Sequence, residues 1–359
     1  MSPDDPPAAR IDADPSPDPT PDPTQEPSVL KARDPEDLLA VVPYRLGFHP
    51  RQSLVALALH GPRRRFGFTA RVDLPPLANV PDVARYLVEV LRHHDADEVL
   101  LIAYAYSDAI AGPLVHTLRQ WLERAGVGLV DAYRSDDRRW FCYTCAKACC
   151  PVEGTPYDLS DHPLAAEHVL RGQVALPDRE ALRAQVAPVS GQRLAAMQRA
   201  FAHVESELAA KVGSGGADRV ALVRSGMAWV RDFVQDWLAD PRALTDREIA
   251  ELAVRVSAVP ARDIAWSMMS RPTASRHLEL WQQALCRVVP PYEPAVACLA
   301  AFAAWLHGSG ALAWCAVERA LEADPGYSWA ELIVQSLEQA VSPSVWQPVP
   351  LEDIERFAC

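Results

Sequence analysis

The order of hydrophobic and polar positions changes character about halfway along the chain. The first half contains short segments that are continuously apolar or strictly alternating, as β-strands buried on two faces or on one face are. These predicted strands lie at residues 53–60, 65–73, 98–104, 128–134 and 139–144. Two helix-like segments, 83–91 and 110–122, follow the second and third strands with apolar residues on one face. This alternation predicts an α/β domain over residues 28–190, with a mixed, mostly parallel sheet covered by helices.

From residue 191 onward the strand patterns stop and helical spacing takes over. Helices are predicted at residues 191–212, 219–238, 245–257, 274–289, 295–306, 311–321 and 329–340, with prolines at several of the boundaries. Thr245 and Glu248 have the spacing of a capping box at the start of the third of these helices. The pattern therefore predicts an all-α domain over residues 191–342, followed by a C-terminal extension at 343–359.

One stretch of this helical half is long enough to be taken for a membrane span. The 24 residues between Glu293 and Glu318 carry no formal charge. Because Gly308 and its polar neighbours interrupt the stretch, we expect a buried helix pair. Residues 295–325 also resemble a single tetratricopeptide-type hairpin, with a generic antiparallel helical hairpin as the alternative. One copy does not make a solenoid.

The N-terminal 27 of the 359 residues differ in composition from the rest. They contain nine prolines, six aspartates and no aromatic residue, and they carry −6 of the net charge of −12. Such a segment cannot bury enough apolar surface to order itself, so we expect residues 1–27 to be a disordered acidic tail. The acidic balance argues against nucleic acid as a partner, and the start lacks the apolar region of a secretory signal. Together with eight cysteines, these features favour a cytoplasmic protein with free or metal-bound thiols and no membrane partner.

The predicted topology suggests where a site would lie. If strands 65–73, 98–104 and 128–134 run in the same direction, their C-terminal ends share one edge of the sheet, where open α/β sheets bind ligands. The hairpin-paired strand 53–60 would begin at that edge. The candidate pocket residues collected in this way are His49, Arg51, Arg71, Asp73, Tyr104, Asp108 and Arg134.

Each of these candidates also has an ordinary structural explanation. His49 with Arg51 could supply a general base and an anion clamp, or both could be solvated residues beside a turn fixed by Pro50. Arg71 and Asp73 could act on a ligand or pair with each other on one strand face. The sequence has no Walker A, Gly-x-Ser-x-Gly or His-Glu-x-x-His motif that would select a chemistry.

Four cysteines form the densest chemical cluster, with the spacing C-x₂-C-x₃-C-C at Cys142, Cys145, Cys149 and Cys150. Thiolates at such spacing can bind zinc. However, adjacent cysteines rarely aim both sulfur atoms at one centre, and no second ligand pair follows at the distance of a zinc ribbon. Buried structural cysteines are therefore favoured, with zinc and a redox or reactive thiol role left open. No metal site is favoured at this stage.

Several separated segments resemble one known family, the domain-of-unknown-function 4192 family. They are Leu38-Leu39, Val42-Pro43-Tyr44-Arg45-Leu46-Gly47-Phe48-His49-Pro50, Ser53-Leu54-Val55, Arg71-Val72-Asp73-Leu74-Pro75, Cys149-Cys150-Pro151-x-Glu153-Gly154-Thr155-Pro156 and Ala320-Leu321-x-x-Asp324-Pro325. The resemblance spans residues 28–340 and implies an actinobacterial origin. It implies no activity, and it transfers no catalytic residue and no cofactor.

The sequence thus favours a binding or interaction protein whose α/β domain holds a small or anionic ligand or contacts a protein partner. The alternative is an enzyme, a hydrolase or transferase, whose pocket uses His49, Arg71 and Asp73 at the carboxyl edge of the sheet. The pattern assembles no complete catalytic constellation, and for this reason binding is the first hypothesis.

Overall fold

The computed structural model describes residues 11–14, 32–145, 149–213 and 219–357 of the chain. The chain divides into two compact units, which are described separately. The first unit comprises Met1–Ala181 with Leu337–Ser342, and the second comprises Leu182–Ser336 with Pro343–Cys359.

The first unit is built on one sheet with the strand order β1-β3-β2-β4-β5-β6-β7. The strands are β1 (Ile11–Asp14), β2 (Ser53–His60), β3 (Arg65–Asp73), β4 (Glu98–Tyr104), β5 (Gly128–Ser135), β6 (Arg139–Cys142) and β7 (Thr155–Pro156). All five strands predicted from the hydrophobic pattern are present. The predicted disordered tail, residues 1–27, lies outside the described residues except for β1, which pairs antiparallel with β3.

The sheet is mixed, but the prediction that it is mostly parallel is wrong. Among the strands described, only β4 and β5 pair in parallel, whereas β2 pairs antiparallel with both β3 and β4. The cause is the β2–β3 hairpin, which places β2 between β3 and β4. The connection from β3 to β4 therefore passes over β2 before the chain re-enters the sheet as β4. Strands β3, β4 and β5 nevertheless run in the same direction, as the predicted edge requires.

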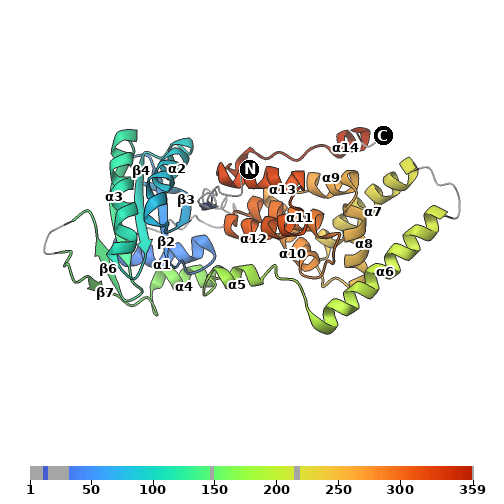
Figure 1. Cartoon of the computed structure of the whole chain (residues 1–359), viewed down its shortest axis with the longest axis horizontal. Coiled ribbons are helices and arrows are strands. Elements are labelled where there is room, and N and C mark those ends of the chain that lie inside the picture. The colour runs from blue at the N-terminus through green and yellow to red at the C-terminus, as the bar shows by residue number, and fades with distance from the viewer. Residues whose placement is uncertain (1–10, 15–31, 146–148, 214–218, 358–359) are drawn as a thin grey trace. The chain divides into compact units, whose positions relative to one another are not determined.

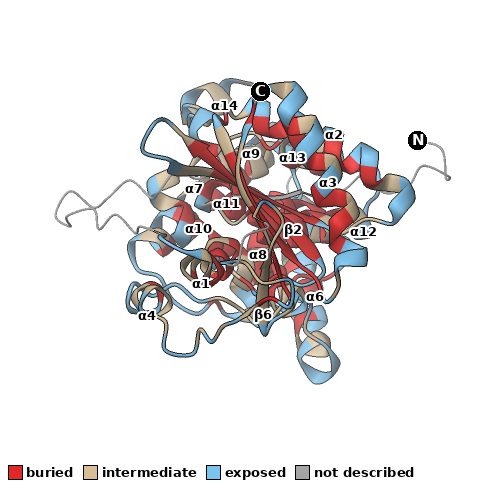
Figure 2. Cartoon of the chain, turned by 90° about the vertical axis from the view of Figure 1, so that its left-hand side faces the viewer, coloured by how far each residue is buried: buried red, intermediate tan, exposed pale blue. Residues whose placement is uncertain are grey.

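Helices cover both faces of this sheet (Figure 1). On one face, α2 (Val80–His93) and α3 (Asp108–Ala125) pack their apolar side chains against alternate residues of β2, β3 and β4. On the other face lies α1 (Pro35–Leu46), because its Arg45 donates to Thr69 Oγ1 at 3.1 Å and Thr69 points away from its neighbours Phe68 and Ala70. The central strands are buried from both sides, which explains why β2 reads as a continuous apolar run (Figure 2).

Helix α1 ends next to the predicted edge of the sheet, just before the segment that leads into β2. The Asp34 side chain accepts a hydrogen bond from the Asp37 amide at its start, and Gly47 ends it with φ 79°. A left-handed residue at this position is the usual helix stop, and glycine adopts it without steric cost. The next residue, Phe48, is buried, and the chain then runs past His49 into β2.

The second unit is helical in the part that the structure describes. Its helices are α6 (Gly191–Gly213), α7 (Arg219–Ala239), α8 (Asp246–Val256), α9 (Val259–Ser267), α10 (Ala274–Leu285), α11 (Glu293–His307), α12 (Gly310–Ala323) and α14 (Leu351–Phe357). Helices α5 (Arg179–Ala184) and α13 (Ser328–Glu338) cross the unit boundaries, and α4 (Pro163–Leu170) belongs to the first unit. Short 3₁₀ helices occupy Leu77–Asn79, Arg271–Thr273 and Pro343–Val345.

The uncharged stretch in this unit forms the expected buried helix pair. Helices α11 and α12 are joined by a tight turn in which Gly308 has φ 88°, and most residues of both helices are buried. Within the described residues, none of the helices combines the length and the apolar character needed to cross a membrane. The predicted capping box is also present, since Thr245 Oγ1 accepts from the Glu248 amide while the Glu248 carboxylate accepts from the Thr245 amide.

Candidate functional site

The strand ends and the segment before β2 meet at one edge of the sheet, as the sequence predicted. Ser53 at the start of β2 lies opposite Asp73 at the end of β3 and, on its other side, opposite Tyr104 at the end of β4. Tyr104 in turn lies opposite Ser135 at the end of β5. Asp73, Ser53, Tyr104 and Ser135 therefore form one row across four strands of the sheet.

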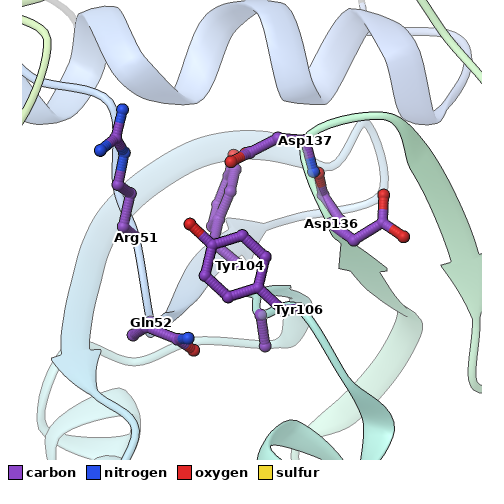
Figure 3. Close-up of a pocket in the computed structure, with 8 residues that line it drawn as sticks. Arg51, Gln52, Tyr104, Tyr106, Asp136 and Asp137 are labelled. Carbon is purple, nitrogen blue, oxygen red and sulfur yellow. The ribbon is translucent and has the colours of Figure 1, made fainter.

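A small hollow lies at this edge (Figure 3). Its lining residues are Arg51, Gln52, Tyr104, Ala105, Tyr106, Ser135, Asp136 and Asp137, and its cavity volume is about 10 Å³. Figure 3 shows Arg51 and Gln52 on one side, Asp136 and Asp137 on the opposite side, and the two tyrosines between them. Opposite charges thus face each other across the hollow.

The hydroxyl group of Tyr104 is the most unusual feature of the hollow. The side chain is only 7 % exposed, and among the described residues its hydroxyl has no hydrogen-bond partner. Burial, with smaller contributions from Tyr157 and Asp137, raises the pKa of Tyr104 well above its ordinary value, so the hydroxyl remains a proton donor. Buried polar groups in proteins nearly always have a partner, so one that lines a hollow points to a molecule that enters it.

Backbone conformation sets the positions of two other lining residues. Gln52 has φ 45° and Asp137 has φ 72°, a region that residues other than glycine rarely occupy. The turn that holds Asp137 is built from its own side chains: Asp136 Oδ1 accepts from the amides of Arg138 and Arg139 at 3.0 and 2.8 Å, and Ser135 Oγ accepts from the Asp137 amide at 3.2 Å. Strained residues that cluster at one hollow are typical of a functional site.

His49 lies near the hollow without lining it. Its amide donates to the carbonyl group of Leu176 at 2.8 Å, which fixes the segment before β2. Burial lowers the pKa of His49, Asp137 raises it in part, and Arg51 lowers it further. The imidazole is therefore neutral at pH 7 and able to accept a proton.

Arg71 and Asp73 pair with each other, which was the structural alternative in the sequence. The guanidinium group of Arg71, which is 3 % exposed, donates to the Asp73 carboxylate, and its Cζ atom lies 5.7 Å from the centre of the Phe48 ring. Asp73 also lies 3.9 Å from Arg179. These groups belong to the same edge but do not line the hollow.

Asp108 and Arg134 meet at a third place, beside Tyr143. Burial and then Asp108 raise the pKa of Tyr143, while Arg134 lowers it in part. Arg134 is buried, donates to the carbonyl group of Ala105 at 3.1 Å, and stacks with its Cζ atom 3.7 Å from the centre of the Phe141 ring. Arg134 therefore holds the residue that follows β4 from outside the hollow, and Asp108 does not line the hollow either.

Of the seven candidate pocket residues, the structure therefore brings only Arg51 and Tyr104 into the lining. Gln52, Tyr106, Ser135, Asp136 and Asp137 lie within three residues of the predicted strands that meet at this edge, but none was singled out. The polar turn after β5 was the one signal in the sequence that could have identified the last three residues.

The cysteine cluster gathers beside β5. The Sγ atoms of Cys145, Cys149 and Cys150 all lie within 4.8 Å of one another, and Cys142, at the end of β6, lies opposite Tyr133 of β5. All four are free thiols in this structure.

Comparison with known proteins gives one match. No curated protein and no solved structure matches the chain. A family described as Domain of unknown function (DUF4192) matches residues 35–344, which is most of the chain and includes both units. The lead-in to the hollow, its strand ends and the cysteine cluster all fall within the matched residues. The chain therefore belongs to the DUF4192 family.

Proposed function

We propose that the first unit is a binding module for a small polar molecule, which enters the hollow at the carboxyl edge of the sheet. The observation that carries the proposal is the Tyr104 hydroxyl, which is buried and has no partner among the described residues. An unpaired buried hydroxyl costs about 1–3 kcal/mol of stability. A bound molecule that accepts a hydrogen bond from Tyr104 would recover this cost.

The lining residues favour a ligand that carries a charged or polar group at each of two ends over a simple anion. Arg51 offers a cationic donor on one side, and Asp137 offers a carboxylate on the other. With a cavity volume of about 10 Å³, the hollow has room for about one water-sized group. One polar group of a zwitterion such as an amino acid, or the tip of a protruding side chain of a protein partner, would therefore enter the hollow while the rest of the molecule stays outside it.

An enzymatic role, as a hydrolase or transferase, is the second candidate. The neutral state of His49 beside Asp137 and Arg51 suits a general base. The ion pair between Arg71 and Asp73, however, leaves these two residues occupied with each other, and Ser135 Oγ is shared between Tyr157 and the Asp137 amide. Binding without chemistry therefore accounts for more of the observed contacts.

A cytoplasmic location is part of the proposal. It is supported by the cysteines that the structure describes, which are free thiols, the form that reducing compartments maintain.

A ligand screen on the full chain tests the proposal. Thermal shift with a panel of amino acids, polyols, sugars and inorganic phosphate identifies binders, and calorimetry then compares the wild type with Tyr104→Phe and Asp137→Asn. Loss of one hydrogen bond of about 1.4 kcal/mol corresponds to a tenfold weaker affinity, which we expect for Tyr104→Phe.

The matched control is Arg138→Gln, because Arg138 lies in the same turn but does not line the hollow. If Tyr104→Phe and Asp137→Asn bind the same molecule with the affinity of the control, the binding site lies elsewhere and the proposal is overturned.

A further inference from the structure

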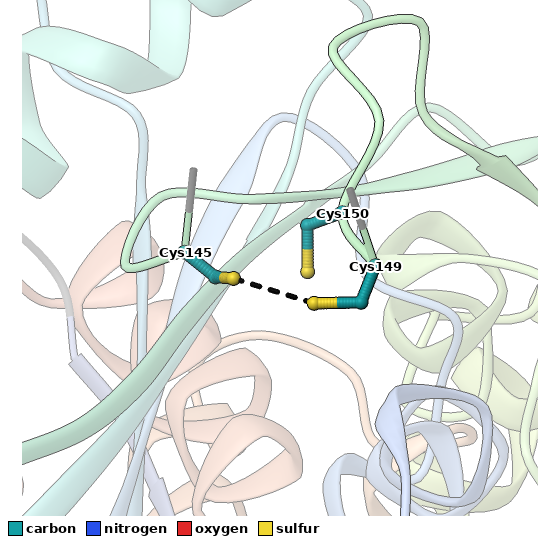
Figure 4. Close-up of side chains that lie close together, drawn as sticks. All are labelled: Cys145, Cys149 and Cys150. Atoms are coloured by element: carbon teal, nitrogen blue, oxygen red, sulfur yellow. Dashed lines mark hydrogen bonds between the residues drawn. The ribbon is translucent and has the colours of Figure 1, made fainter. Parts of the chain in front are cut away.

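The loop between β6 and β7 brings sulfur atoms together from three positions in the sequence (Figure 4). Cys145 Sγ lies 3.6 Å from Cys149 Sγ, and the sulfur atom of Cys150 completes a triangle whose sides are all below 4.8 Å. The sequence argument against a metal assumed that adjacent cysteines point apart. In this loop, Cys149 and Cys150 both turn toward Cys145.

The spacing of the sulfur atoms fits a tetrahedral zinc centre. With a zinc–sulfur distance of about 2.3 Å, tetrahedral geometry places neighbouring ligand sulfurs about 3.8 Å apart. The observed separation of 3.6 Å between Cys145 and Cys149 is close to this value and well above the roughly 2.05 Å of a disulfide. The remaining sulfur pairs need to close by less than about an ångström.

A fourth thiol is available at the end of β6. Cys142 is not in the group of sulfurs that lie within 4.8 Å of one another, so its side chain would turn toward that group when a metal binds. Cys142 Sγ lies 3.2 Å from Thr144 Oγ1, and this hydroxyl also donates to the Asp131 carboxylate. Thr144 therefore holds Cys142 beside β5.

We propose that Cys145, Cys149 and Cys150, completed by Cys142, bind one zinc ion that fixes the loop between β6 and β7. Four protein thiolates leave no open position, so the site is structural. Binding a divalent ion displaces thiol protons to solvent and changes no oxidation state.

A structural metal suits the place of this loop in the fold. Val152 in the loop is 94 % exposed, so apolar burial contributes little to its stability there. The loop leads into β7 and Tyr157, whose amide donates to the Arg138 carbonyl group at 3.1 Å. A cross-link between the end of β6 and Cys150 would therefore order the return of the chain toward the hollow. The metal site does not depend on the proposed ligand.

Cobalt titration of the full chain tests this proposal. The protein is purified without chelator, reduced with a phosphine, freed of metal and titrated with Co²⁺, whose tetrahedral thiolate complexes show intense visible d–d bands and thiolate charge-transfer bands. We expect these bands to saturate at about one Co²⁺ per chain and to disappear when Zn²⁺ is added.

Variants locate the ligands. Cys145→Ser and Cys150→Ser should lose the tetrahedral bands, while Cys286→Ser, a partly buried thiol in the helical unit, should titrate as the wild type does. Far-UV circular dichroism of the same samples verifies that each variant is folded. The proposal is overturned if the folded, reduced wild type shows no tetrahedral bands, or if Cys145→Ser and Cys150→Ser retain them.

Discussion

The hydroxyl groups of Ser135 and Tyr157 lie 2.7 Å apart and join the end of β5 to the residue that follows β7. Ser135 lines the hollow and is 1 % exposed, while Tyr157 lies after the cysteine loop. Burial is the main cause that raises the pKa of Tyr157, with Asp137 and Asp136 adding to it and Ser135 opposing it. The rim of the hollow therefore depends on a contact from a segment more than twenty residues away along the chain.

Ser135→Ala should lower the free energy of unfolding of the first unit by about 1–3 kcal/mol, because it removes the partner of the half-buried Tyr157 hydroxyl and the acceptor of the Asp137 amide. Chemical denaturation measures the change. Tyr157→Phe removes only the shared bond, so we expect it to cost less. If the two substitutions prove additive in a double-mutant cycle, the hydroxyl groups do not interact.

Gly154→Ala should destabilise the loop before β7 more than Gly172→Ala does, although both glycines have nearly the same φ, 75° and 76°. A methyl group at Gly154 would lie 2.6 Å from the Phe141 ring, whereas nothing lies within 4 Å at Gly172. We expect about 1 kcal/mol for the left-handed conformation at each site, and about 1–3 kcal/mol more at Gly154 from overpacking. Equal losses in denaturation experiments would show that the Phe141 contact is absent.

The second unit should lose stability in mild acid through His277. This side chain is fully buried, and burial, opposed in part by the Met268 backbone, lowers its pKa from 6.5 to about 4. Below pH 6.5 the unfolded chain binds a proton that the folded chain does not bind until about pH 4. The free energy of unfolding should therefore fall by about 3 kcal/mol across this range.

A substitution isolates this effect from other titrating groups. His277→Gln should flatten the decrease between pH 6.5 and 4, whereas His203→Gln, at an exposed position in the same unit, should follow the wild type. Denaturant titrations at a series of pH values measure both variants. An unchanged pH dependence in His277→Gln would refute the role of this histidine.

Thr245→Ala should remove the capping box of α8 and cost about 1 kcal/mol, because the Glu248 amide loses its acceptor, 3.2 Å away. Thr245→Ser keeps the hydroxyl and should retain most of the stability. A similar loss in both variants, measured by chemical denaturation, would assign the effect to the threonine methyl group instead.

The direction of the strands could be predicted from the sequence, whereas the order in which they lie in the sheet could not. Alternation of strands and helices requires β3, β4 and β5 to run the same way, and this alone places their ends at one edge. Strand β2 is apolar on both faces, and such a pattern is satisfied at any interior position of a sheet. The sequence pattern therefore did not show that β2 lies between β3 and β4.

Helix α9 was not predicted because Pro260 was read as a boundary. Pro260 lies in the first turn of α9, where the backbone needs no amide donor.

The candidate site was predictable as a region but not residue by residue. The sequence predicted Arg51 and Tyr104 at the correct edge of the sheet. It could not show that Arg71 and Asp73 form an ion pair with each other. That the Tyr104 hydroxyl has no partner in the described part of the chain depends on side chains from several segments at once. The same holds for Cys149 and Cys150, whose directions follow from the path of the loop and not from their adjacency.

The unfolding free energy of Tyr104→Phe tests the central claim, that the Tyr104 hydroxyl has no partner among the described residues and is available to the proposed ligand, and it requires no knowledge of that ligand. If the hydroxyl has no partner in the free protein, its removal should leave stability unchanged or raise it by up to about 3 kcal/mol. Chemical denaturation of the full chain, with Tyr157→Phe as a tyrosine whose hydroxyl is bonded, gives the comparison. A loss of more than about 1 kcal/mol in Tyr104→Phe would show that the fold itself uses this hydroxyl and would contradict the account.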